Sequence, residues 1–465
     1  MKIKLLLQLP LLLLVISTPG AHAQTNSDFS LKQAQDFAVL NSTANKNAEI
    51  DLELAKKKVW ETTAIGLPQL NAAVNYTHLF SVPSMQLPYT VLGFKDVAST
   101  DTPITFDDIT AGRIFAYGDT TGAPRIPLGV QDNTTLEFTV SQLIFSGEYL
   151  VGLRASKVFY MISQQAKQKS EQDTRESVAN TYFLVLMLQN NFEVMTQSLT
   201  NLNKTLTEMK EMHKQGFVEI TDVDQIELTT LTLQNGINSM ERQIRAAKDL
   251  LKFQIGYPME KEINLTDNLE ALAADINLES LVNPEYKVEN NINFQIMETQ
   301  VKLGKLNLQR EKSTFLPTLA AVYRHTEKFK TVSFDFVPVD VFALSLNWGL
   351  FSSGQRYVKV QQRQLEYEKA INNRDNVANG LKLEYINARN EMINAYDNFN
   401  NVKKNLELTK RIYDKTLIKF KEGLSTSMDL TQAQNQFLSA QSEYINNLNA
   451  MLSAKSKLTK LTTNL

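Results

Sequence analysis

The chain has 465 residues, no cysteine, and 48 lysine and arginine residues against 50 aspartate and glutamate residues. The absence of cysteine excludes disulfide bonds, thiolate metal sites, a cysteine nucleophile and a lipid-modified N-terminal cysteine. The near-neutral charge argues against a nucleic-acid partner, because nucleic-acid binding relies on a cationic excess. With only four histidines, a histidine-rich metal or general-base cluster has little material, so we expect no metal and no cofactor.

The first residues are typical of a signal peptide over residues 1–23. Two lysines precede an apolar stretch over residues 5–16, and residues 21–23 form an A-x-A cleavage pattern. This stretch is shorter than the about 20 residues that a membrane-spanning helix needs. No comparable apolar run follows in the chain. We therefore expect an exported protein without a transmembrane helix.

A helix and a strand hairpin are predicted next. We expect the helix over residues 30–66, ended by Leu67-Pro68, and the strand hairpin over residues 69–145. Alternation favours strands, since Leu70, Ala72 and Val74 share one face. Each strand has about 10 to 12 residues, the length of a tilted membrane-crossing strand. A long loop over residues 81–133 joins the two strands, and its role is left open.

Long helices are predicted where proline is absent. No proline lies between Pro127 and Pro258, and an interior proline costs a helix about 3 kcal/mol. Apolar residues in this region step alternately by three and four positions, which is the seam of a coiled coil. The pattern breaks at Gly216. It therefore predicts an antiparallel helical hairpin over residues 147–255.

The second half repeats this order of elements. After a linking segment over residues 257–285, we expect a helix over residues 286–315, a strand hairpin over residues 318–350 and a helical hairpin over residues 354–461. Gly354 and Gly423 are separated by the same number of residues as Gly147 and Gly216. The chain is thus an internal duplication, with a first repeat over residues 24–256 and a second over residues 286–465.

The four predicted strands are too few to close a barrel by themselves. A barrel with fewer than about eight strands has no room for its own side chains, and an open sheet in a membrane would leave unpaired backbone groups in hydrocarbon. The pattern therefore predicts a barrel shared between several copies of the chain, arranged as a ring.

These motifs resemble the TolC-type outer-membrane efflux protein family over essentially the whole mature chain. The shared features are the Leu-Pro ends at Leu67-Pro68 and Leu316-Pro317, the F-S-G turn into a long helix, and the two turns that begin at Gly216 and Gly423. The resemblance implies a mainly α fold with a small β part. Long antiparallel coiled-coil hairpins form an α-barrel, and four strands from each protomer enter a shared 12-stranded barrel.

The same resemblance implies a function. A homotrimer would sit in the lipid of the outer membrane of a Gram-negative bacterium and extend into the periplasm. It would be the passive exit duct of a tripartite efflux or type I secretion system. Its partners would be a periplasmic adaptor (membrane fusion) protein and an inner-membrane RND or ABC transporter.

The two turns carry the candidate site residues. Gly216 and Gly423 permit the positive φ that ends a helix, and the turns are the expected sites of adaptor docking. Asp222 and Asp429 each follow six residues later, where a carboxylate is also favoured as part of a helix cap. The resemblance implies a pore constriction at Asp429, with Gln432 at the position of a second carboxylate. Capping and gating both remain open for these aspartates.

The resemblance also singles out two positions that would act in the closed state of the channel. Phe420 and Ser425 stand where well-studied members of the family place a tyrosine and an arginine that lock the channel. The capping residue of the return helix is predicted among four residues, namely Thr221, Ser425, Thr426 and Ser427.

Two other functional classes were weighed. One is an exported coiled-coil structural or adhesive surface protein without channel activity, against which the alternating strands count. The other is an enzyme, for which the sequence offers no clustered acid, base, nucleophile or phosphate loop. His78 and His325 occupy matching strand positions, and we favour a polar role at the loop edge over a metal site. His213 is expected to pack at the tip.

Overall fold

The computed structural model describes residues 27–86, 89–94, 114–119, 125–274, 276–330 and 337–462. The predicted signal peptide and much of the loop over residues 81–133 lie outside these residues. The chain forms two compact units, and each unit combines segments of both repeats. Within the described parts, no helix is both long and apolar enough to cross a membrane.

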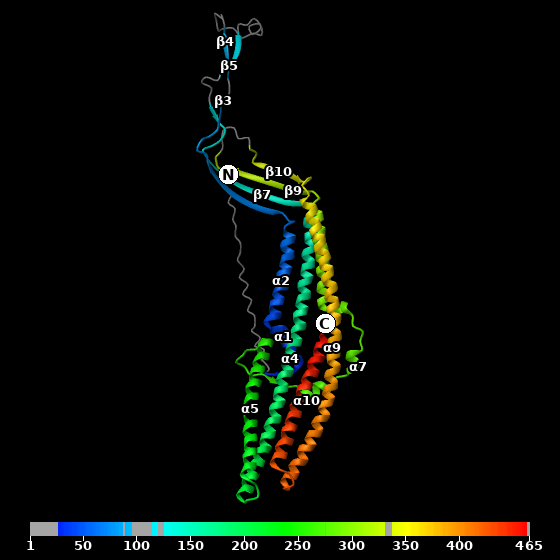
Figure 1. The fold of residues 1–465 in the computed structure, drawn as a ribbon. Coiled ribbons are helices and arrows are strands. Elements are labelled where there is room, and N and C mark those ends of the chain that lie inside the picture. The colour runs from blue at the N-terminus through cyan, green and yellow to red at the C-terminus, as the bar shows by residue number, and fades with distance from the viewer. Residues whose placement is uncertain are drawn as a thin grey trace. The chain divides into compact units, whose positions relative to one another are not determined.

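The first unit comprises Met1–Asn47, Ser170–Lys287 and Lys382–Leu465. Its two antiparallel hairpins pair α4 (Gly147–Lys214) with α5 (Ile220–Ile255) and α9 (Gln355–Lys421) with α10 (Ser427–Thr462), as Figure 1 shows. Helices α4 and α9 begin in the second unit. The shorter elements of the first unit are α1 (Leu31–Asn41), α6 (Leu269–Ala274), α7 (Leu278–Val282) and the parallel strands β1 (Asp28–Phe29) and β8 (Asn264–Leu265).

Apolar seams hold the hairpins of the first unit together. The larger core is centred on Tyr182, Met392 and Met451 and includes residues of α1 and α5. The Tyr182 hydroxyl donates to Asp267 at 3.1 Å, and burial raises the pKa of Tyr182 well above its ordinary value. Asp267 also accepts from the backbone N–H of Leu31 at 2.6 Å. The segment between the repeats therefore fixes the start of α1.

The second unit comprises Ala48–Lys169 and Val288–Leu381. Its main sheet is antiparallel in the order β10-β9-β7-β2 (Figure 1). The strands are β2 (Gln69–His78), β7 (Asp132–Phe145), β9 (Thr318–Lys328) and β10 (Asp340–Asn347). Two short strand pairs occupy part of the predicted loop: β3 (Ser84–Gln86) with β6 (Arg125–Pro127), and β4 (Tyr89–Phe94) with β5 (Ile114–Asp119).

The register of the main sheet separates an apolar face from a polar one. Residues paired across two strands point to the same face. Leu70 lies opposite Val140, and Leu346 lies opposite Leu319. The other face is polar, as at the pair Asn71 and Thr139. Side chains on the apolar face are exposed in the single chain, among them Leu70, Val74, Phe138, Phe342, Leu344 and Leu346.

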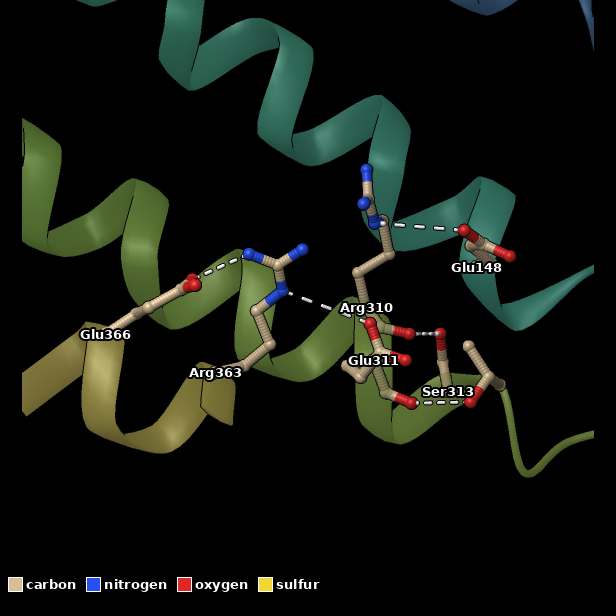
Figure 2. Close-up of polar contacts among 7 residues, drawn as sticks. Glu148, Arg310, Glu311, Ser313, Arg363 and Glu366 are labelled. Carbon is tan, nitrogen blue, oxygen red and sulfur yellow. Dashed lines mark hydrogen bonds and ion pairs between the residues drawn. The ribbon is translucent and has the colours of Figure 1, made fainter. Parts of the chain in front are cut away.

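Helices of the second unit are joined by ion pairs in the order α2-α4-α8-α9. The remaining helices are α2 (Thr43–Ala64), η1 (Val288–Asn290) and α8 (Ile292–Ser313). Lys167 of α4 pairs with Glu49 of α2. Figure 2 shows the other two links, from Arg310 to Glu148 at 3.8 Å and from Arg363 to Glu311 at 4.0 Å. Helices α2 and α9 are therefore the edges of this layer.

Two predicted helices have different limits in the structure. The helix expected over residues 30–66 is divided at Ser42, whose extended ψ of 142° ends α1 and whose hydroxyl accepts from the backbone N–H of Asn45. The helix expected from residue 286 begins instead as α8 at Ile292, because the Asn291 side chain caps it by accepting from Asn293 at 2.9 Å. A single capping residue leaves no mark on apolar periodicity.

We predict opposite stability effects from alanine at two glycines. Gly256 has a φ of +73°, and an added Cβ would lie 2.5 Å from the backbone oxygen of Asn41. Gly256→Ala should therefore cost about 1–3 kcal/mol. Gly152 lies inside α4 with open space around it, so Gly152→Ala should stabilise the helix by about 0.5–1 kcal/mol. The unfolding midpoint of each variant, measured by circular dichroism in detergent, is compared with that of the wild type. Midpoints equal to the wild-type value in both variants would contradict the prediction.

Candidate functional site

Both helical hairpins turn in the same way at their tips. Gly216 has a φ of +80° and Gly423 a φ of +71°. The residue after each glycine donates its N–H five residues back, from Phe217 to Met212 at 3.0 Å and from Leu424 to Lys419 at 2.8 Å. This is the Schellman pattern, which requires the left-handed conformation that glycine adopts without strain.

The side chains at these turns are exposed and apolar. Phe217 is 74% exposed and Leu424 is 77% exposed. In a Schellman turn this residue commonly packs back on its helix, but neither side chain does so here. The tips thus present apolar surface in equivalent positions of the two repeats. The Nδ1–H of His213 donates to the carbonyl oxygen of Val218 at 2.8 Å. His213 thus packs within the first tip, as the sequence predicts.

The return helix of the second hairpin has a reciprocal cap. The Thr426 hydroxyl accepts from the backbone N–H of Asp429 at 3.1 Å, and the Asp429 carboxylate accepts from the backbone N–H of Thr426 at 3.0 Å. The hydroxyls of Thr426 and Ser425 also donate to Asp429, at 2.8 and 3.2 Å. This is a capping box. Of the candidate capping residues in the sequence, Thr426 is the one that caps α10.

The first hairpin lacks this arrangement. Its return helix, α5, has Glu219 at the N-cap position, and the Glu219 side chain makes no capping hydrogen bond. Thr221 is not the cap, because it lies inside the first turn of α5 and its hydroxyl donates to the Glu219 carboxylate at 3.3 Å. The Asp222 carboxylate therefore takes no part in a helix cap. It accepts a hydrogen bond from the hydroxyl of Ser427 instead.

The Asp222–Ser427 hydrogen bond joins the two hairpins at their tips. A second link pairs Lys421 of α9 with Glu208 of α4 at 3.6 Å. Phe420 adds an apolar contact, since it packs against the core of the first hairpin around Met209 and Ile226. The sequence gives no sign of the Asp222–Ser427 contact, because the two residues are 205 positions apart and only the packing of one repeat on the other brings them together.

The seam between α10 and α5 is polar near the tips. Ser427, Thr431 and Gln434 are all at least nine-tenths buried. In the described part of the chain, Thr431 Oγ1 and Gln434 Nε2 have no hydrogen-bond partner. A buried polar atom without a partner destabilises its interface by about 1–3 kcal/mol. These two atoms therefore weaken the contact between the hairpins near their tips.

Gln432 lies beside this seam and is exposed. It lines a groove of about 530 Å³ that also holds Met428 and Thr431. Asp429 is exposed at the start of α10. The structure therefore brings Asp222, Asp429 and Gln432 to the tip region, while only Asp222 contacts the opposite hairpin.

The strand histidines bind carboxylates on the neighbouring strand. His78 Nδ1 lies 2.7 Å from Asp132, and His325 Nδ1 lies 2.7 Å from Asp340. The sequence-based prediction missed these partners, because it considered only residues on the same strand as each histidine. Among the residues that the structure describes, no group of three or more histidine and acidic side chains has the geometry to hold a metal ion.

Comparison with known proteins connects this architecture to outer-membrane channels. Residues 286–464 match the model of the outer membrane efflux protein family. The matched residues correspond to the second repeat. The resemblance drawn from the Leu-Pro, F-S-G and tip motifs is therefore confirmed. No curated protein matches the chain.

Solved structures extend the TolC-type fold to nearly the whole chain. The outer membrane protein VceC from Vibrio cholerae is 15% identical, with a TM-score of 0.68 over 93% of this chain and 96% of that chain. The CmeC outer membrane channel of Campylobacter jejuni is 14% identical, with a TM-score of 0.69 over 93% and 85%. The MtrE outer membrane channel of Neisseria gonorrhoeae is 13% identical, with a TM-score of 0.70 over 93% and 88%. At these identities the likeness shows the fold, which is mainly α with a small β part as predicted.

The cap at Asp429 should weaken in acid. Hydrogen bonds from the Thr426 backbone N–H, the Thr426 hydroxyl and the Ser425 hydroxyl hold the pKa of Asp429 below its ordinary value of 3.8. A carboxyl with a lowered folded-state pKa stabilises the fold above its unfolded pKa, and this stabilisation is lost as the pH falls through the folded value.

Hydrogen exchange of the segment around residues 425–434 tests this expectation. Protection in the native chain should exceed that in Asp429→Ala above about pH 4, and the difference should disappear as the pH falls below 3.8. A difference that stays constant to pH 2 would show that the carboxylate charge has no part in the cap.

Proposed function

We propose that the chain is a homotrimeric outer-membrane channel that serves as the passive exit duct of a tripartite efflux or type I secretion system. The observation that carries the proposal is the main sheet of the second unit, which has one apolar face, one polar face and two open edges.

The open edges of the sheet favour assembly. Strands β2 and β10 each have one neighbour in the single chain, so each leaves a row of unpaired backbone groups. In hydrocarbon each unpaired group costs several kcal/mol. Pairing β10 of one copy with β2 of the next satisfies both rows, and three copies supply a closed ring. The apolar face then meets lipid, and the polar face surrounds the pore.

The polar face is suited to a water-filled pore. Arg324 and Glu137 form an ion pair on this face, with 3.3 Å between Nε and Oε1. Asn71, Asn75 and Thr139 share the face. A lumen lined by such groups passes polar solutes and requires no chemistry from the chain.

The helix layer of the second unit has the same requirement as the sheet. Its edge helices expose large apolar side chains, such as Trp60 of α2 at 64% and Leu365 of α9 at 64%. Exposed apolar surface of this kind marks an interaction site. Contact between α2 of one copy and α9 of the next would extend the ring of strands into a ring of helices that reaches into the periplasm.

The tips provide the surface for a periplasmic adaptor, at the turns of Gly216 and Gly423. Phe217 and Leu424 are exposed there in equivalent positions, so one adaptor surface would meet two similar docking points on each protomer. The energy for export then comes from an inner-membrane transporter of the RND or ABC class. Enzymatic activity is not part of the proposed function.

The tips also form the gate. The second hairpin is held against the first by the Asp222–Ser427 hydrogen bond, the Lys421–Glu208 ion pair and the packing of Phe420. Ser427, Thr431 and Gln434 make the contact between the hairpins polar near the tips, where the gate would open. Asp429 and Gln432 would line the constriction, with one Asp429 carboxylate from each protomer.

Introduced cysteines test the assembly. The chain has no cysteine of its own, so a disulfide reports only the designed pair. Leu346→Cys in β10 is combined in turn with cysteine at each apolar-face position of β2, which are Leu70, Ala72, Val74, Tyr76 and His78. One register should yield covalent dimers and trimers on denaturing gels. Leu346→Cys with Asn71→Cys, on opposite faces, is the control. Monomers in every combination would overturn the trimer.

Planar-bilayer recording tests the gate. Asp222→Ala removes the oxygen that accepts from Ser427, so it should raise single-channel conductance or the fraction of time open. Asp224→Ala is the matched control, because Asp224 is exposed two residues later. In the same recordings Asp429→Ala should weaken block by divalent cations. Conductance and open time unchanged in Asp222→Ala would exclude a gating role for the Asp222–Ser427 hydrogen bond. Block unchanged in Asp429→Ala would assign that residue to capping alone.

A further inference from the structure

The first unit also contains a cavity that is lined by residues other than those of the tips. Its volume is about 270 Å³. Four elements line it: α1, α4, α6 and α10. They come from the start of the mature chain, from each repeat and from the segment between the repeats. Neither the proposed pore nor the adaptor surface uses it.

The floor of the cavity is apolar and well packed. Ala179, Phe183 and Leu452 are each less than 5% exposed, and Leu31 and Leu272 complete the apolar lining. Such a surface favours an alkyl chain, because burial of apolar area contributes roughly 25 cal/mol per Å². It disfavours a peptide segment, whose backbone groups need hydrogen-bond partners.

Two of the three lining cations are already neutralised. Lys460 lies 2.6 Å from Asp173 and 2.7 Å from Glu176. Burial lowers the pKa of Lys460, but the hydrogen bonds to these carboxylates outweigh it and raise the pKa above its ordinary value. Arg175 pairs with Asp36 at 2.8 Å. Both of these side chains are therefore held by the protein itself.

Lys455 is the remaining lining cation. Within the described residues it has neither an ion pair nor a hydrogen bond, and it is only partly exposed. Its neighbour Lys457, two positions along α10, instead pairs with Glu391 of α9 at 2.7 Å. The cavity thus combines an apolar floor with one lysine that has no carboxylate partner of its own.

From this combination we propose that the cavity binds a small amphiphile with an alkyl tail and a single anionic headgroup. The tail lies on Ala179, Phe183 and Leu452, and the headgroup meets the ammonium of Lys455. A water molecule occupies about 30 Å³ of liquid, so the cavity holds about nine non-hydrogen atoms. This size fits an alkyl tail of seven or eight carbons, such as the seven-carbon tail of octanoate with its carboxylate beside Lys455.

The test uses the full chain in nanodiscs and ¹³C NMR of [1-¹³C]octanoate, with empty nanodiscs as the blank. Wild type should show saturable binding above the blank. Lys455→Gln should weaken octanoate binding about tenfold, as expected for loss of a charge-assisted contact, and should leave binding of [1-¹³C]octan-1-ol unchanged. Lys457→Gln is the matched control and should bind octanoate as wild type does.

A second variant locates the tail. Ala179→Phe fills the cavity and should abolish binding of both octanoate and octanol, while circular dichroism verifies that the variant is folded. Because Lys455→Gln changes a partly exposed side chain, it tests the headgroup contact even if Ala179→Phe does not fold. Absence of saturable binding in wild type, or octanoate affinity equal in wild type and Lys455→Gln, would overturn the proposal.

Discussion

The open edges of the four-stranded sheet are the constraint on which the rest of the architecture depends. Strands β2 and β10 each leave one side unpaired, and the sheet between them exposes a continuous apolar face. In a single chain the unpaired strand edges are unfavourable in lipid, and the exposed apolar face is unfavourable in water. The exposed apolar side chains on the edge helices α2 and α9 follow the same rule. In the assembly proposed above, neighbouring copies of the chain would cover both the edges of the sheet and the exposed side chains of the helix layer.

Duplication gives the chain two similar hairpins, but their tips have diverged. The turns at Gly216 and Gly423 have the same hydrogen bonds, because both require a positive φ. Asp429 is held by its own capping box, whereas Asp222 has no cap to complete and contacts the other hairpin. Equivalent carboxylates therefore perform different tasks.

Prediction succeeded where the signal was local. The helical hairpins expected over residues 147–255 and 354–461 appear as α4–α5 and α9–α10, because glycine and the absence of proline act within one turn of helix. It failed at Ser42 and Asn291, where one side chain ends or starts a helix without altering the apolar pattern. The partners of His78 and His325 were also missed, since they lie across a strand pair.

The sequence by itself determined the order of the elements, the faces of the strands and the position of the two tip turns. These properties depend on φ, on side-chain period and on proline, all of which act over a few residues. Only the tertiary structure decided that each compact unit is built from both repeats, that Asp222 contacts Ser427, and that Lys455 lies unpaired over an apolar floor. Such contacts join residues hundreds of positions apart, and their formation depends on how whole helices pack.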